Sequence, residues 1–232
     1  MWRDFCYAQV VKDEPKEYSD GWTQFLGCKI DLSKRPLIPR PETEFWVEKA
    51  VACIKGQASG LTRGLALGPS VLDLFTGSGC IGIAVATQCP TAEVTLADIK
   101  NLISTPLPKN SKFVQSDLFS KLAGKFDFIL ANPPYVPTVG PTSRDALRGA
   151  SIMDHEPKEA LYAGKDGLDV IKKFLEQAPS HLNKGGQIWM EFGSEQKEEI
   201  TNLLREFNYY QGFACTFHRD QHDRWRYLVA TN

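Results

Sequence analysis

One tetrapeptide in the chain, Asn132-Pro133-Pro134-Tyr135, has side chains suited to group transfer onto a planar nitrogen. An amide or an exocyclic amine is a weak nucleophile, so its N–H bonds must be held against fixed acceptors. The side chain of Asn132 and the backbone carbonyl of Pro133 offer two such acceptors. The prolines lack N–H donors and stiffen the loop, and Tyr135 offers a face for stacking. The tetrapeptide indicates methyl transfer and leaves open whether the acceptor is an amide or an aminopurine.

A glycine-rich turn upstream suits a nucleoside ligand. Residues 77–82 read G-x-G-x-x-G, and glycines there let backbone N–H groups approach a ligand closely. Asp98 ends the next apolar run, where its carboxylate can accept two ribose hydroxyls. Asp73 precedes the glycines, where it would repel a pyrophosphate and hold a cationic amino-acid group. With Asp117, these acids favour S-adenosylmethionine over NAD as the ligand.

Short apolar runs alternating with amphipathic stretches predict the elements that carry these residues. We expect strands at 71–75, 93–98, 112–115, 126–131, 187–192, 213–217 and 225–230, and helices at 42–55, 81–88, 166–182 and 195–207.

This alternation predicts an α/β, Rossmann-like fold with a seven-stranded, mostly parallel sheet. The last two strands are joined by the polar turn 218–223, which is too short for a parallel crossover, so one strand should be antiparallel. Residues 22–32 predict a short hairpin. We therefore expect an N-terminal hairpin extension over 1–41 and a catalytic domain over 42–232.

Composition narrows the class of protein. The 232 residues carry 27 Lys plus Arg and 28 Asp plus Glu, and the net charge of -1 disfavours sequence-blind nucleic-acid binding. The apolar runs fall well below the ~18 residues of a membrane span, and no leader peptide is evident. The six cysteines lack zinc-site spacing, and His218 and His222 read as solvated surface. We expect a cytoplasmic protein without a metal.

Four segments of the sequence resemble the HemK/PrmC family of protein-glutamine N-methyltransferases, which methylate the glutamine of the GGQ loop in peptide chain release factors. The resemblance begins near Glu14. It is carried by LIPRPETE at 37–44, the turn at 73–79, the tetrapeptide at 132–135 and the segment 156–168. Adenine-N6 DNA methyltransferases share only the two middle segments, so the outer two make the resemblance specific.

The resemblance implies roles for individual residues. The S-adenosylmethionine pocket would be lined by Asp73, Phe75, Thr76, Gly77, Ser78, Gly79, Asp98, Asp117, Leu118 and Asn132. The catalytic and glutamine-binding residues would be Asn132, Pro133, Pro134 and Tyr135. Arg40, Glu42 and Glu156 would shape the substrate entrance, and for Glu156 both a cation pair and a turn cap stay open. The partner would be a release factor bound by a monomer, with ribosome contact left open.

The chain departs from the family pattern in three places. Phe75 stands where the family usually has a glycine, so the backbone contact there is expected to be rearranged. Pro106 and Pro108 interrupt 99–111, so we expect the usual crossover helix to shrink to a turn or less. Only about twenty residues precede Trp22, so we expect the family's helical N-terminal domain to be missing.

Two other functions remain open from the sequence. One is methylation of an exocyclic amine of adenine or guanine in DNA or RNA. The other is a degenerate cofactor-binding subunit, which Phe75 and the shortened crossover suggest and the intact tetrapeptide opposes.

Overall fold

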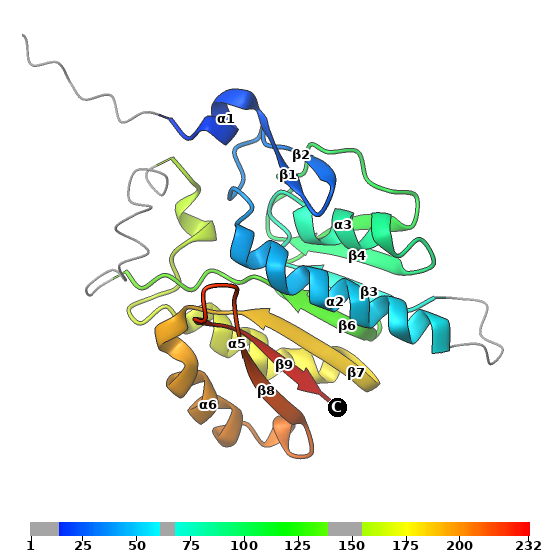
Figure 1. Ribbon diagram of the computed structural model, residues 1–232. Helices are drawn as coiled ribbons and strands as arrows, with labels where there is room; N and C mark the ends of the chain where they lie inside the picture. The colour runs from blue at the N-terminus through cyan, green and yellow to red at the C-terminus, as the bar shows by residue number, and fades with distance from the viewer. Residues whose placement is uncertain (1–13, 61–67, 139–154) are drawn as a thin grey trace, which may run out of the picture.

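The structure is a computed structural model that describes residues 14–60, 68–138 and 155–232. A seven-stranded sheet with strand order β5-β4-β3-β6-β7-β9-β8 forms its centre (Figure 1). The strands are β3 (Ser70–Leu74), β4 (Glu93–Asp98), β5 (Ser111–Gln115), β6 (Phe126–Ala131), β7 (Leu182–Glu191), β8 (Ala214–Arg219) and β9 (Trp225–Thr231).

The strand directions confirm the predicted topology. The neighbours from β5 through β7 pair in parallel, whereas β9 pairs antiparallel with both β7 and β8. Apart from one aspartate in each, the central strands β3 and β6 are mostly apolar, and they are almost wholly buried, as is typical of parallel strands covered on both faces. The edge strands β5 and β8 alternate between exposed and partly buried residues.

Helices cover both faces of the sheet (Figure 1). Those on one face are α2 (Pro41–Gly60) and α3 (Cys80–Gln88), and those on the other are α5 (Asp169–Gln177) and α6 (Lys197–Glu206). Alternate residues of each central strand supply two hydrophobic clusters: Phe128 and Leu130 pack on the α2 and α3 side, and Ile129 and Ala131 on the α5 and α6 side.

Several predicted boundaries were wrong by a few residues. The helix that begins at Pro41 runs to Gly60, and the predicted helix 166–182 is α5 followed by the 3-10 turn η2 (Ala178–His181). The predicted helix 195–207 divides into η3 (Ser194–Gln196) and α6. Strand β3 ends at Leu74, because Phe75 adopts a left-handed backbone that no strand accommodates.

The N-terminal segment contains α1 (Lys16–Asp20) and a hairpin of β1 (Trp22–Phe25) and β2 (Cys28–Asp31). Residues 99–110 contain no helix, which confirms the predicted loss of a crossover helix. Hydrogen bonds from the N-terminal segment hold residues 99–110 in place. The Asp31 N–H donates to Thr105 Oγ1 at 2.8 Å, and Lys34 Nζ donates to the Ile103 carbonyl at 2.7 Å.

Two short 3-10 turns complete the described chain, η1 (Lys158–Ala160) and η4 (Asn208–Tyr210). Within the described ranges, no helix combines the length and the apolar character needed to cross a bilayer.

Candidate active site

The turn between β3 and α3 lies at the carboxyl ends of the parallel strands, where open α/β sheets bind ligands. Three of its residues have positive φ: Phe75 at 65°, Gly77 at 51° and Gly79 at 85°. The Thr76 N–H donates to the Ala97 carbonyl at 3.1 Å, which joins the turn to β4. Phe75 therefore keeps a backbone conformation that glycine adopts easily, and its ring packs 6.0 Å from that of Phe174.

Asp73 is fully buried at the base of this turn. Its Oδ2 accepts hydrogen bonds from Thr76 Oγ1 at 2.5 Å and the Gly82 N–H at 2.8 Å. Its Oδ1 has no hydrogen-bond partner among the described residues. Burial raises the pKa of Asp73 to about 7. A buried carboxylate with one bare oxygen is costly unless a donor reaches it, so this site fits the ammonium group of a ligand.

Two further acids lie at the ends of the neighbouring strands. Asp98 ends β4 and its Oδ2 accepts the Gly77 N–H at 2.9 Å, while burial raises the pKa of its carboxyl group. Asp117 follows β5 and is exposed, and Leu118 beside it has a φ of 48°. The parallel register of β3, β4 and β5 thus brings Asp73, Asp98 and Asp117 to one edge of the sheet.

The tetrapeptide Asn132–Tyr135 follows β6 at the same edge of the sheet. Asn132 Nδ2 donates to Thr43 Oγ1 of α2 at 3.3 Å. The Tyr135 hydroxyl donates to Glu191 Oε1 of β7 at 3.0 Å, and its pKa is raised by burial and by that carboxylate. Pro133 is buried, and the fixed φ angles of Pro133 and Pro134 make the loop rigid. The Tyr135 hydroxyl therefore faces the protein interior.

Glu191, which the sequence did not single out, links this loop to α2. It is 1% exposed, and its Oε2 accepts from Thr43 Oγ1 and Trp46 Nε1, each at 2.7 Å. Burial raises the pKa of Glu191, while these donors and the charge of Arg226 oppose that shift. One signal was available in the sequence: a charged residue inside an apolar strand is almost never fully buried without partners.

Gln196 of η3 was also missed. Its Nε2 donates to the Tyr135 carbonyl at 2.9 Å and lies 3.3 Å from the carbonyls of Asp166 and Gly167. Its Oε1 accepts the Gly193 N–H at 2.9 Å. Both ends of Tyr135 are thus held by residues at and just after the end of β7, its hydroxyl by Glu191 and its carbonyl by Gln196.

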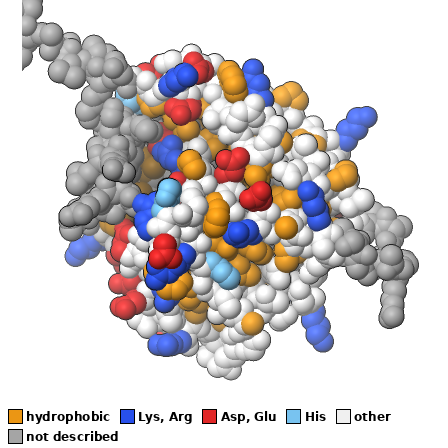
Figure 2. Space-filling view, in the orientation of Figure 1, with side chains coloured by type: hydrophobic (Ala, Val, Ile, Leu, Met, Phe, Trp, Pro, Cys, Tyr) orange, Lys and Arg blue, Asp and Glu red, His pale blue; other side chains and the backbone are white. Residues whose placement is uncertain are grey.

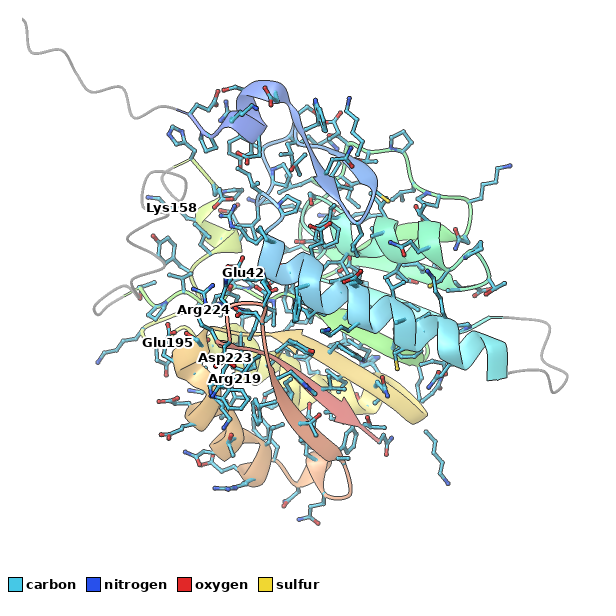
Figure 3. The ribbon with its side chains drawn as sticks, viewed as in Figure 1. Glu42, Lys158, Glu195, Arg219, Asp223 and Arg224 are labelled. Atoms are coloured by element: carbon cyan, nitrogen blue, oxygen red, sulfur yellow. The ribbon has the colours of Figure 1, made fainter. Side chains whose placement is uncertain are left out.

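The predicted entrance residues form ion pairs. Glu156 is buried and binds Arg40 Nη2 at 2.5 Å and the Ile38 N–H at 2.8 Å, so of the two open alternatives it pairs with a cation. Glu42 accepts from Arg224 Nη2 at 2.9 Å, where the start of α2 meets the turn between β8 and β9 (Figure 3). Contact of Arg40, Glu42 and Glu156 with a substrate stays a prediction.

Comparisons with known proteins place the chain among methyltransferases. The family model described as "Methyltransferase small domain" matches residues 61–145. The release factor glutamine methyltransferase of Streptococcus pneumoniae is 33% identical over 207 residues, which cover 86% of this chain and 69% of that protein.

Two solved structures share the fold. A release factor-specific protein-(glutamine-N5) methyltransferase from Alicyclobacillus acidocaldarius has a TM-score of 0.50 at 23% identity and covers 84% of this chain and 94% of its own. The Thermus thermophilus 16S rRNA N2 G1207 methyltransferase, in complex with AdoMet and guanosine, has a TM-score of 0.58 at 20% identity. The match covers 91% of this chain and 49% of that one. On the identity and coverage of its curated relative, the chain belongs to the release factor glutamine methyltransferase family.

Proposed function

We propose that this protein transfers a methyl group from S-adenosylmethionine to the side-chain amide nitrogen of the glutamine in the GGQ motif of a release factor. The observation that carries the proposal is the acceptor loop Asn132–Tyr135, anchored through Thr43 and Glu191, beside a glycine turn in a chain of this family. Within the family, such a loop is expected to hold a planar amide.

The residues of the glycine turn fit the proposed cofactor. When bound, S-adenosylmethionine supplies a methyl group carried on a sulfonium, which makes it electrophilic. The bare Oδ1 of Asp73 would accept from the cofactor's ammonium group. Asp98 would accept from the ribose hydroxyls, since a carboxylate offers about four lone pairs and keeps capacity beyond the Gly77 N–H. Phe75, Thr76, Gly77, Ser78, Gly79, Asp117 and Leu118 would complete the pocket.

The acceptor loop would orient the substrate glutamine. Asn132 Oδ1 and the Pro133 carbonyl would accept its two N–H bonds, which turns the nitrogen lone pair toward the methyl group. Methyl transfer would form an N–C bond as the S–C bond of the donor breaks in line, so that the donor leaves as a neutral thioether, and the amide proton would then pass to water. An N-protonated amide is a strong acid, so no dedicated base is required. Fixed orientation is the main source of rate in such a site.

The charges on one face of the molecule favour a protein substrate over a nucleic acid. Acidic and basic side chains are interspersed on the face shown in Figure 2, and the net charge is -1. A phosphate backbone would be bound by a basic stripe. We therefore propose a release factor as partner, bound by a monomer, and the cytoplasm as compartment because release factors act in translation.

Methyl transfer from labelled S-adenosylmethionine tests the proposal. The protein is incubated with a release factor, with the release factor in which the GGQ glutamine is replaced by alanine, and with DNA and RNA. We expect label on the unmodified release factor alone. Label on nucleic acid alone would replace this function by methylation of an exocyclic amine, and no label on any of them would favour a cofactor-binding subunit.

A further inference from the structure

Glu191 is a buried carboxylate with donors on both of its oxygens. Trp46 and Thr43 of α2 donate to Oε2, and the Tyr135 hydroxyl donates to Oε1. It lies at the end of β7, beside β6, whose chain continues into the acceptor loop. The proposed chemistry does not use Glu191 directly, so its cost of burial calls for another role.

The directions of these hydrogen bonds follow from the chemistry of the groups. An indole nitrogen is a donor only, so the oxygen that faces Trp46 must accept. Thr43 lies 2.7 Å from that same oxygen and has a single hydroxyl proton, which it gives to Glu191. Thr43 Oγ1 is left with lone pairs alone.

The hydroxyl of Thr43 in turn contacts the side chain of Asn132. Because Thr43 Oγ1 can only accept from it, the NH2 group of Asn132 must face Thr43, at 3.3 Å. The other arm of the same planar amide, Oδ1, is then turned away from Thr43. A flipped amide would present its NH2 group instead, and two N–H donors facing each other form no hydrogen bond.

We propose that Glu191 fixes the orientation of the Asn132 amide through the hydroxyl of Thr43. Trp46 can only donate, so it requires the oxygen of Glu191 that it faces to be an acceptor. Glu191 and Thr43 are then positioning residues for the acceptor amide, an inference that rests on the proposed function. The Glu191–Tyr135 bond holds the other end of the same loop, so one carboxylate positions both functional side chains.

Paired substitutions at Thr43 test the relay. Thr43→Val keeps the shape of the side chain and removes the hydroxyl, whereas Thr43→Ser keeps the hydroxyl and removes a methyl group. We expect Thr43→Val to lower kcat by about 10- to 100-fold, as small misplacements in catalytic sites do, with KM for S-adenosylmethionine unchanged. Thr43→Ser should stay within about threefold of the unmodified protein. If Thr43 only packs against its neighbours, the order reverses, since Ser leaves a cavity and Val does not.

Glu191 provides a second pair. In Glu191→Gln the amide oxygen can take the position of Oε2, because Trp46 selects an acceptor there, so the direction of the Thr43 bond persists. We expect kcat within about fivefold for Glu191→Gln and a loss like that of Thr43→Val for Glu191→Met. Asp127→Asn is the matched control: Asp127 is a part-buried carboxylate that binds Ser70 and Asn183 at the opposite end of the sheet. It should lower Tm without changing kcat.

A measurement without turnover separates this inference from the proposed function. Hydrogen exchange of the Asn132 side-chain NH2 group is followed by NMR, with Asn132→Ala to assign the signals. We expect exchange about fivefold faster in Thr43→Val than in Thr43→Ser, which corresponds to the loss of one hydrogen bond worth roughly 1 kcal/mol. Equal exchange and equal kcat in the two variants would overturn the relay. If the unmodified protein does not methylate a release factor while the two Thr43 variants still differ in exchange, only the proposed function is overturned.

Discussion

Asp73 carries the clearest pH-dependent prediction at the scale of single residues. Burial raises its pKa from the usual 3.8 to about 7. A cationic ligand binds the ionised carboxylate, so affinity should fall as pH drops below about 7, approaching about tenfold per pH unit well below the pKa. Calorimetric titration of S-adenosylmethionine between pH 5.5 and 8.5 checks this. In Asp73→Asn the affinity should be weak and flat across that range; an unchanged slope would assign the titration to another group.

Phe75 makes a second prediction at this scale because its φ of 65° is unusual for a residue with a Cβ. Truncating it to alanine or to glycine removes the same contact with Phe174, so comparing the two variants isolates the backbone. We expect Phe75→Gly to be more stable than Phe75→Ala by about 1 kcal/mol, the reverse of the usual order. Urea unfolding measures the difference. The usual order, with alanine more stable, would show that the turn does not hold this conformation in solution.

At the scale of elements, the turn that precedes α5 packs against the acceptor loop. Gly167 has a φ of +75°, and a Cβ there would lie 2.2 Å from the Tyr135 carbonyl oxygen and 2.8 Å from Gln196 Nε2. Gly185 has a φ of +76° with nothing within 4 Å of a Cβ. These two glycines form a matched pair. At both, a residue with a Cβ would have a strained left-handed backbone, but only at Gly167 would the Cβ collide with neighbouring atoms.

We expect Gly185→Ala to cost about 1–2 kcal/mol of stability and to leave kcat unchanged, because only the left-handed backbone is strained. Gly167→Ala must also displace Tyr135, so kcat should fall by about tenfold or more. Urea unfolding and methyl-transfer assays on both variants give the comparison. Equal kcat values would mean that the loop tolerates this shift.

At the scale of the whole molecule, the N-terminal hairpin shares its core with the sheet. Phe25 and Ile30 of the hairpin are buried in the same hydrophobic cluster as α2 and α3. The division into an extension over 1–41 and a catalytic domain over 42–232 stays a prediction. Burial in one cluster favours unfolding of both parts together.

Phe25→Ala tests this cooperativity. We expect a loss of about 3–5 kcal/mol in one transition, with tryptophan fluorescence and far-UV circular dichroism coinciding. Trp22→Ala on the same hairpin is the control: its side chain is 37% exposed and contacts Lys29, so it should cost about 1 kcal/mol or less. Two separate transitions would establish the hairpin as an independent unit.

Local patterns in the chain were sufficient for the sheet, its antiparallel strand and the family. Apolar runs and glycine spacing are short-range signals, and the segments at 37–44 and 156–168 make the family resemblance specific without any knowledge of distances in the fold. The sequence also predicted the loss of the crossover helix, because the prolines at 106 and 108 lack the backbone N–H groups that a helix needs.

Only the tertiary structure brought together the groups that hold the acceptor loop. Thr43, Asn132 and Glu191 belong to a helix, a loop and a strand that are far apart in the chain. Thr43 and Asn132 look ordinary in their own segments, as a helix residue and an amide after a strand. Glu191 stands out as an acid inside an apolar run, but the run does not indicate its partners. Their hydrogen-bond directions depend on which donors surround one carboxylate. Local sequence determines backbone conformation and apolar pattern, whereas the partners of a buried polar group are decided by long-range packing.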